Sequence, residues 1–166
     1  MKRILFILLL FIPLYLSGQV ISSTVSYASD LYSPEMITDG TFDVGSAWGV
    51  NGGWSYDAVN DHMDFDDITN GNLTQVDGAM AFPIQINKTY KLEFDISIVG
   101  GGNANFCIKS TDGVTWVDYA DYANGHHNFE INTGADIGAG GLYIRADENN
   151  CDAAFTIDNI SIMEVF

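Results

Sequence analysis

The sequence predicts an all-β fold, an antiparallel β-sandwich or barrel in a single domain. Three observations predict it: hydrophobic and polar residues alternate in several short stretches, turn-forming pairs separate these stretches, and no helical spacing of hydrophobic residues follows residue 20. The chain has 166 residues, which is long enough to bury one core of ordinary size.

The clearest expected strand is residues 89–98, TYKLEFDISI, because every second residue is hydrophobic: Tyr90, Leu92, Phe94, Ile96 and Ile98. Shorter strands of the same type are expected at residues 105–110, 127–132 and 141–146. In the last expected strand, residues 154–165, the hydrophobic positions change parity at Asp158-Asn159, which predicts a β-bulge there. Asn-Gly, Asp-Gly and Gly-Gly pairs between the stretches favour turns.

Residues 1–18 are interpreted as a secretory signal peptide. A basic start precedes an apolar run over residues 4–16, and cleavage is expected after Gly18. An uncleaved membrane anchor is the alternative, although the run is shorter than the ~20 residues that a spanning helix needs. We expect residues 19–34 to form an N-terminal arm and residues 35–166 to form the domain, secreted or at the cell surface and not inserted in a membrane after cleavage.

The charge of the chain excludes some partners. It has 22 acidic and 6 basic residues and a formal net charge of −16, which repels nucleic acid and anionic lipid. Of the acidic residues, 17 are aspartate, which favours turns and the coordination of hard cations. Cys107 and Cys151 form either a disulfide, as an exported protein permits, or two inert thiols.

Three stretches carry a family resemblance: MITDGTFDVGSAWGVNGGWSY at residues 36–56, LTQVDGAMAFPIQINKTYKLEFDI at residues 73–96, and AAFTIDNISIMEV at residues 153–165. In this order they resemble the galactose-binding-like jelly rolls, in particular the non-catalytic carbohydrate-binding modules of secreted glycosidases. The resemblance implies a two-sheet antiparallel jelly roll that binds carbohydrate. The same module occurs in virion, tail and adhesion proteins, so the fold does not by itself assign the function.

The resemblance also implies a structural calcium ion between the opening turn and the closing strand. Asp43 and Asp158 would supply carboxylates, and Asp39 and Thr41 would add side-chain or carbonyl oxygens. The alternative is that Asp39 and Asp43 only terminate turns, while Asp158 accepts main-chain hydrogen bonds at the bulge. The sequence leaves both open.

Carbohydrate binding needs flat aromatic faces that stack on sugar rings, with polar groups beside them. The candidates are Trp54, Tyr56, Trp116, Tyr119 and Tyr122. In a regular strand Trp116 and Tyr119 point to opposite faces, so they cannot form one platform. Trp48 matches the structural tryptophan of the resembling family, and we expect it in the core.

No sequence motif indicates an enzyme. The adjacent His126 and His127 point oppositely on a strand and lack a third ligand, which argues against zinc. No nucleophile elbow or phosphate-binding glycine loop is present. The first hypothesis is therefore a secreted, non-catalytic module that binds a polysaccharide or surface glycan. The alternative is a structural or adhesive subunit that associates with itself or within a larger extracellular assembly or virion.

Overall fold

The computed structural model describes residues 31–135, 140–147, 149, 151 and 153–166. The chain divides into two compact units, one of Pro34–Val165 and one of residues 1–33 with Phe166. The expected signal peptide and most of the expected arm lie outside the described residues. Within the described part of the chain, no helix is long and apolar enough to cross a membrane.

The unit Pro34–Val165 is built from strands and one short 3-10 helix. Its elements are β1 (Gly49–Asn51), β2 (Trp54–Asp57), β3 (His62–Phe65), β4 (Gly71–Gln75), η1 (Asp77–Ala79), β5 (Thr89–Ile98), β6 (Ala104–Ser110), β7 (Thr115–Tyr122), β8 (Gly125–Asn132), β9 (Leu142–Ala146) and β10 (Phe155–Glu164). The strands expected at residues 89–98, 105–110, 127–132 and 141–146 are confirmed as β5, β6, β8 and β9.

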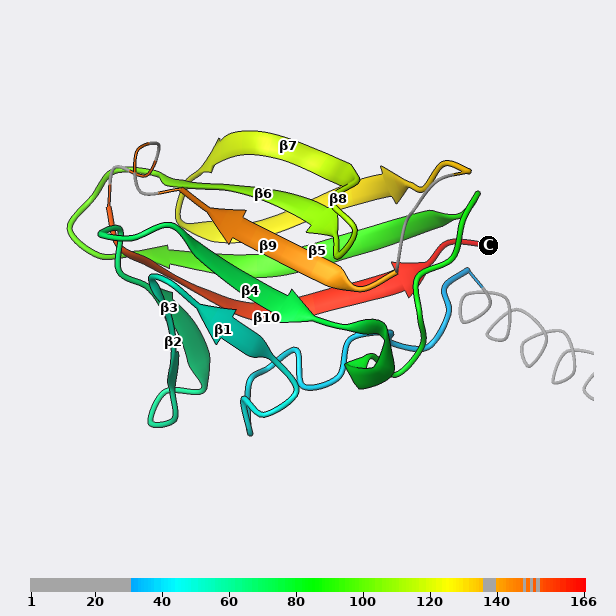
Figure 1. Cartoon of the computed structure of the whole chain (residues 1–166), viewed down its shortest axis with the longest axis horizontal. Coiled ribbons are helices and arrows are strands. Elements are labelled where there is room, and N and C mark those ends of the chain that lie inside the picture. The colour runs from blue at the N-terminus through cyan, green and yellow to red at the C-terminus, as the bar shows by residue number, and fades with distance from the viewer. Residues whose placement is uncertain (1–30, 136–139, 148, 150, 152) are drawn as a thin grey trace, which may run out of the picture. The chain divides into compact units, whose positions relative to one another are not determined.

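The strands form two five-stranded antiparallel sheets, which lie one in front of the other in Figure 1. The nearer sheet, called here the front sheet, has the order β1-β4-β9-β6-β7, and the back sheet has the order β2-β3-β10-β5-β8. Neighbours in each sheet are mostly distant in sequence, as in a jelly roll. The predicted two-sheet β-sandwich is confirmed.

Strand β5 shows why the sequence specifies this arrangement. Its residues Tyr90, Leu92, Phe94 and Ile96 are buried, and the residues between them face outward. Because side chains alternate along a strand, one face of the sheet packs on the core while the other meets water. β5 pairs with β10 on one side and with β8 on the other, so it lies inside the back sheet.

Strand β10 contains the predicted bulge. Its register with β5 shifts between Asp158 and Ser161, and Asn159 has a φ of 52°. The extra residue changes the parity of the strand, so Ile157 and Ile160 both point into the core although they are an odd number of residues apart.

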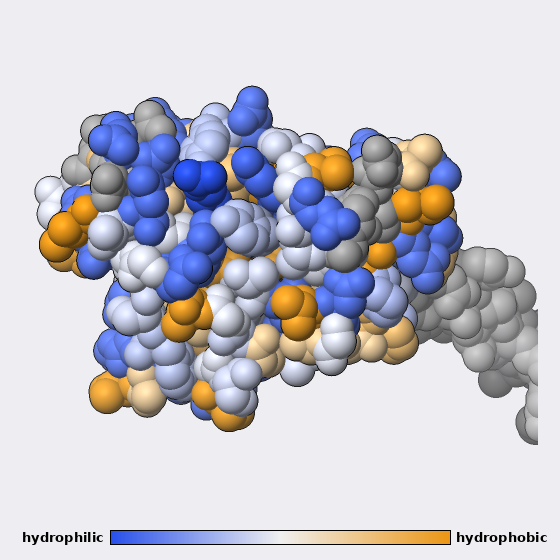
Figure 2. Space-filling view, in the orientation of Figure 1, coloured by the Kyte–Doolittle hydropathy of each residue, from blue (hydrophilic) through white to orange (hydrophobic). Residues whose placement is uncertain are grey.

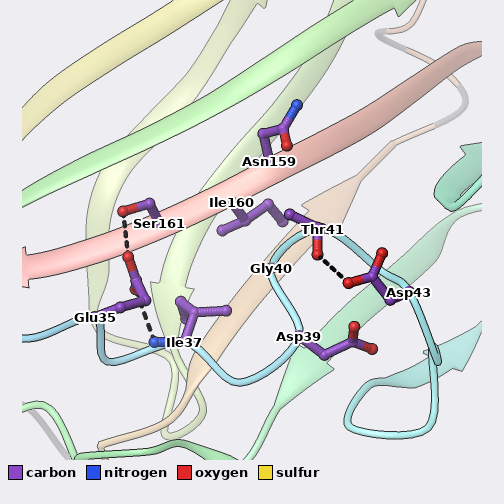
Figure 3. A pocket seen from close by; sticks show the side chains of 9 residues that line it. All are labelled: Glu35, Ile37, Asp39, Gly40, Thr41, Asp43, Asn159, Ile160 and Ser161. Atoms are coloured by element: carbon purple, nitrogen blue, oxygen red, sulfur yellow. Dashed lines mark hydrogen bonds between the residues drawn. The ribbon is translucent and has the colours of Figure 1, made fainter.

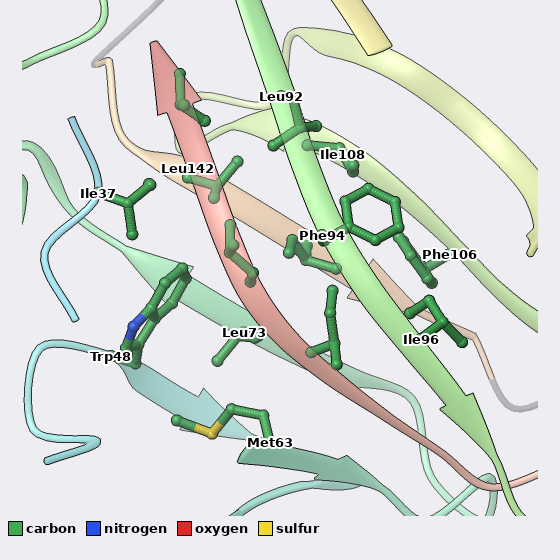
Figure 4. Packing of buried hydrophobic residues seen from close by; sticks show 14 of the residues in the cluster. Ile37, Trp48, Met63, Leu73, Leu92, Phe94, Ile96, Phe106, Ile108 and Leu142 are labelled. Carbon is green, nitrogen blue, oxygen red and sulfur yellow. The ribbon is translucent and has the colours of Figure 1, made fainter. Parts of the chain in front are cut away.

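The core is a continuous layer of side chains from both sheets (Figure 4). Phe106 of the front sheet lies 5.4 Å from Phe94 and 5.7 Å from Phe155 of the back sheet, measured between ring centroids. Trp48 is buried as expected, with its ring 5.2 Å from that of Phe42. Large aromatic side chains of this kind supply much of the free energy of burial in a small domain.

The two cysteines are free thiols in this structure. Cys107 is buried, and the Cys151 sulfur accepts a hydrogen bond from the backbone N–H of Asn105 at 3.3 Å and donates one to its carbonyl at 3.1 Å. Burial raises the pKa of the Cys151 thiol, which keeps it in the unreactive protonated form. The geometry agrees with the alternative of two inert thiols.

Candidate functional site

The opening turn closes on itself through Asp39. The Asp39 carboxylate accepts hydrogen bonds from the backbone N–H groups of Val44 at 3.3 Å and Gly45 at 2.7 Å. Its carbonyl oxygen accepts one from the indole N–H of Trp48 at 2.9 Å. Asp39 also has a φ of 59°, a left-handed conformation that aspartate tolerates better than most residues. This carboxylate therefore acts as a turn former.

A hollow of about 520 Å³ lies between this turn and the bulge of β10 (Figure 3). It is lined by Glu35, Ile37, Asp39, Gly40, Thr41, Asp43, Asn159, Ile160 and Ser161. The Gly40 carbonyl accepts a hydrogen bond from the Ile160 N–H at 2.9 Å. A Cβ atom at Gly40 would lie 2.0 Å from the Ile160 carbonyl oxygen, so the close approach of turn and strand requires glycine.

The predicted calcium ligands are only partly brought together. Asp39, Thr41 and Asp43 line the hollow, and the Thr41 hydroxyl donates to the Asp43 carboxylate at 3.0 Å (Figure 3). Asp158 instead lines a separate hollow of about 350 Å³ beside His62 and Asp95. There burial raises the pKa of Asp158, although the N–H of Asn159 donates to its carboxylate at 2.6 Å.

The four-residue ligand set is thus corrected. The bulge turns Asp158 away from the opening turn, and both oxygens of Asp39 already bind backbone N–H groups. Calcium takes six to eight oxygen ligands, and of the predicted four residues Asp39, Thr41 and Asp43 share one hollow, which Asp158 does not line. Calcium binding itself remains a prediction from the resemblance.

Glu35 is a residue that the sequence analysis missed. One of its carboxylate oxygens accepts hydrogen bonds from the backbone N–H groups of Met36 and Ile37 at 2.9 Å and of Ile162 at 2.8 Å. The other accepts from the Ser161 hydroxyl (Figure 3). Glu35 therefore joins the start of the domain to β10. In the sequence, Glu35 is marked only by its position directly before Met36 and Ile37, the first hydrophobic pair of the expected domain.

Two of the predicted sugar-stacking residues are corrected because they lie in the core. Trp54 is 4% exposed and packs on Phe65 and Phe155 at 5.3 and 5.5 Å between centroids. Tyr122 is 3% exposed and stacks on Phe106 at 4.2 Å, and burial raises its pKa to about 12. Neither ring is accessible to a ligand, because its faces already contact other aromatic side chains.

The other three candidates are partly exposed, in different places. Trp116 packs against the core and buries its indole N–H. Tyr56 lies in the back sheet against the opening turn, where its ring occupies the space next to Gly45. Tyr119 lies on the outer face of the front sheet, against the Cys107 thiol and 5.9 Å from the Lys109 ammonium to its ring centroid. Trp116 thus packs toward the core while Tyr119 contacts Lys109 on the outer face, in a strand whose register with β6 shifts twice.

The outer face of the front sheet, called here the front face, gathers polar side chains from neighbouring strands. Arg145 of β9 pairs in register with Asn72 of β4 and Cys107 of β6. One pair further along, Tyr143 lies between Thr74 and Lys109. The residues that alternate with these are buried, so this row points outward: Leu73, Leu142, Ile144, Phe106 and Ile108.

Hydrogen bonds hold several of these side chains in place. The Tyr143 hydroxyl donates to the Asn72 side-chain oxygen, and the Asn72 amide donates to Asn51 at 3.0 Å. The Asn105 amide donates to Asp121 at 2.7 Å, while the side-chain oxygen of Asn105 is buried and has no protein partner in the described part of the chain. A buried acceptor of this kind is usually satisfied by water or a ligand.

Figure 2 shows the front face from outside: hydrophilic residues cover most of it, and hydrophobic residues form separate small groups. A hollow of about 270 Å³ is lined by Lys109, Ser110, Thr111, Asp112, Gly113, Tyr143 and Arg145. Tyrosine phenols are protonated at neutral pH and can donate hydrogen bonds, and partial burial raises the pKa of Tyr119 and Tyr143 further. The face therefore offers aromatic rings beside amide, hydroxyl and basic groups.

No protein-family model matches the chain, and no curated protein matches it. Solved structures match its fold. A CBM4 structure has a TM-score of 0.55 at 13% identity and covers 77% of this chain and 99% of its own. TmCBM61 in complex with β-1,4-galactotriose has a TM-score of 0.51 at 15% identity, with coverages of 80% and 99%. A cyclase from Fischerella sp. TAU has a TM-score of 0.55 at 13% identity, with coverages of 78% and 96%.

Longer proteins also contain this fold. The chain spans 27% of the arabinose-bound MgGH51 α-L-arabinofuranosidase and 21% of the bacteriophage CBA120 tailspike protein 4 domain that it matches. At these identities the likeness shows the fold, which is the jelly roll of the carbohydrate-binding modules, as the sequence resemblance predicted. The cyclase shows that the same fold occurs in enzymes.

Proposed function

We propose that this protein is a secreted, non-catalytic carbohydrate-binding protein that holds a poly- or oligosaccharide across the front face. The likeness to CBM4 and TmCBM61 supports carbohydrate as the ligand class, and TmCBM61 was solved with a galactotriose. The apolar run at the start of the sequence supports export.

The position of Tyr119 carries the proposal. Of the five aromatic residues that the sequence nominates, Tyr119 is the one on a broad polar face rather than in the core or against a turn. Tyr143 lies on the same face one strand beyond β6, and the two rings flank Lys109. Aromatic rings among hydrogen-bonding groups are what a pyranose ring needs, because its C–H face is apolar and its edge carries hydroxyls.

Binding on this face needs little rearrangement. Asn51, Asn72 and Tyr143 already hold one another by hydrogen bonds, so a sugar hydroxyl meets groups in fixed positions. The side-chain oxygen of Asn105 is buried without a protein partner in the described residues and can accept from a hydroxyl or from water. The ligand is held by stacking and hydrogen bonds, and no covalent step is involved.

The test is a glycan array followed by calorimetric titration of the glycans that bind. We expect Tyr119→Ala and Tyr143→Ala each to weaken binding at least about tenfold, which corresponds to the loss of one stacking contact, while the melting temperature changes little. Tyr56→Ala is the matched control, because it removes a partly exposed tyrosine from the back sheet.

Loss of binding in Tyr56→Ala with full binding in Tyr119→Ala would move the site to the back sheet and contradict the proposal. The alternative function, a subunit of an extracellular assembly, makes a different prediction. In that case no glycan binds, and light scattering after size-exclusion chromatography shows a concentration-dependent oligomer.

A further inference from the structure

The four basic residues that the structure describes differ in whether they form ion pairs. Among the described residues, the Lys88 ammonium pairs with Glu164, and the Lys91 ammonium pairs with Glu93 at 2.8 Å. Lys109 and Arg145 are the other two, and within the described part of the chain neither has a carboxylate oxygen within ion-pair distance. With 22 acidic residues in the sequence, two cations without such a partner are unexpected.

These two cations lie together on the front face. Lys109 is on β6 and Arg145 on the neighbouring β9, offset by two residues in the register, so their Cβ atoms are at a diagonal distance of roughly 7–8 Å. Both line the hollow that also contains Tyr143. Burial raises the pKa of the Tyr119 and Tyr143 phenols, and the positive charge of Arg145 opposes this at both, which indicates that the guanidinium lies near both rings.

Several carboxylates lie near the two cations, and three of them accept hydrogen bonds from neutral N–H groups while keeping their negative charge. The Asp121 carboxylate accepts from the Asn105 amide at 2.7 Å, and the Asp118 carboxylate accepts from the backbone N–H of Tyr119 at 2.8 Å. The Asp147 carboxylate accepts from the backbone and side chain of Asn149. Asp112 lines the same hollow and contributes one negative charge against the two positive ones.

We propose that the front face binds an acidic glycan, in which a carboxylate or sulfate group on the sugar is held by Arg145 and Lys109. This inference rests on the proposed function and names its ligand class. A guanidinium presents paired N–H donors that match the two oxygens of a carboxylate or sulfate. The chain is strongly acidic overall, and the other two described cations, Lys88 and Lys91, are already paired, so an acidic group is held best beside Lys109 and Arg145. A neutral glycan would gain little from either cation.

The experiment titrates the protein with four probes: oligogalacturonate for a carboxylate, κ-carrageenan oligosaccharide for a sulfate, and β-1,4-galactan and cello-oligosaccharides as neutral sugars. We expect at least one acidic probe to bind ten times or more tightly than both neutral ones. Raising the salt from low to high concentration weakens this binding, because the ion pairs are exposed. Binding of oligogalacturonate or of carrageenan then identifies the acidic group.

Variants link the preference to the two cations. Arg145→Gln and Lys109→Gln each lower the affinity for the acidic probe about tenfold, whereas Lys91→Gln, a matched change on the back sheet, alters it less than about twofold. Equal or tighter binding of the neutral probes, unchanged in Arg145→Gln but lost in Tyr119→Ala, overturns this inference and leaves the proposed function standing. Absence of binding to all four probes and to the glycan array overturns both.

Discussion

The two outer faces of the sandwich differ in chemistry, although the inner faces are alike. Inside, both sheets contribute buried aliphatic and aromatic side chains. Outside, the front face carries amides, two tyrosines and two cations beside the carboxylates of Asp112 and Asp121, while the back sheet carries a row of acidic residues: Asp57, Asp64, Glu93, Asp95 and Asp158. Alternation along a strand specifies the buried positions and leaves the outward ones free to vary with function.

On the outer face of the back sheet, called here the acidic face, two histidines lie among the carboxylates. His126 contacts Asp95 through Nδ1 at 2.9 Å and Glu93 through Nε2 at 3.3 Å. His62 lies 3.1 Å from Asp64. The two cations of the front face have no carboxylate oxygen within ion-pair distance among the described residues, and this contrast supports the proposed site there.

One group on the acidic face has the composition of a metal site: Asp57, His62 and Asp64. The Asp57 carboxylate, however, already accepts hydrogen bonds from the backbone N–H of Val59 at 2.8 Å and from the side-chain amide of Asn60 at 2.8 Å. These bonds lower the pKa of Asp57 and give it a role in the β2–β3 turn. In this group, the Asp57 carboxylate therefore stabilises the turn between β2 and β3.

The largest expected effect is on stability, and it tests whether Trp54 belongs to the core or to a binding surface. Trp54→Ala removes a buried indole and should lower the free energy of unfolding by about 3–5 kcal/mol, as for other large-to-small core changes. Chemical denaturation measures this, and Trp54→Phe should recover part of the loss. A folded Trp54→Ala protein of unchanged stability that no longer binds glycan would show that this ring is a ligand contact after all.

A charge reversal compares the two faces directly. Arg145→Glu should weaken binding of an acidic glycan by about a hundredfold, because it replaces an attraction with a repulsion and corresponds to about 2.8 kcal/mol. Lys91→Glu makes the same change of charge on the back sheet and should have little effect. Similar losses in both variants, measured by calorimetry, would mean that only the net charge of the molecule matters.

Added calcium tests the hollow at the opening turn. We expect added calcium to stabilise the wild-type protein and Asp158→Asn alike, but not Asp43→Asn, because Asp43 lines the hollow at the opening turn and Asp158 does not. At a concentration of 100 Kd the gain would be about 2.7 kcal/mol. Differential scanning calorimetry with and without EDTA measures it. An unchanged melting temperature in the wild type would remove calcium from the description of this protein.

The smallest effect concerns pH. Hydrogen bonds to Asp95 and then Glu93 raise the pKa of His126, so its contribution to stability is full below the ordinary histidine value of about 6.5 and is lost as pH rises through the higher folded pKa. Hydrogen bonding to Lys91 and then His126 outweighs burial and lowers the pKa of Glu93, so its contribution is lost on acidification.

We therefore expect the melting temperature to fall by at most a few degrees between pH 6 and pH 8. Asp158 belongs to the same row of acidic residues, and burial raises its pKa. Its ionisation as the pH rises through the acidic range therefore lowers the stability of the fold. His126→Gln should flatten the decline above pH 6, while His127→Gln, on the neighbouring position, should not. An identical pH profile in His126→Gln would mean that the titration of His126 does not contribute to the pH dependence of stability.

The fold could be predicted from the sequence because β5 and β10 are long and strongly alternating. The bulge at Asp158 was visible as a change in the parity of hydrophobic residues. The site was harder to predict because the sequence does not say which face of a short strand is buried. Trp54 and Tyr122 look like binding aromatics in the sequence, yet both rings belong to the core.

The polar residues of the front face were missed for the opposite reason. Tyr143 and Arg145 occupy the outward positions of a strand that was recognised only by its buried Leu142 and Ile144. Reading the outward parity of β6 and β9 together would have found Lys109, Tyr143 and Arg145. Their adjacency, however, depends on the pairing of strands that are about 35 residues apart in sequence, and one sequence does not reveal that register.

Strand β7 has a consequence for how these molecules behave when crowded. It forms an edge of the front sheet, and its register with β6 shifts twice, between Phe106 and Ile108 and between Ile108 and Lys109. An irregular edge is a poor template for a further strand, because its free N–H and C=O groups do not form an even row. Pairing of two molecules through the β7 edge is therefore disfavoured.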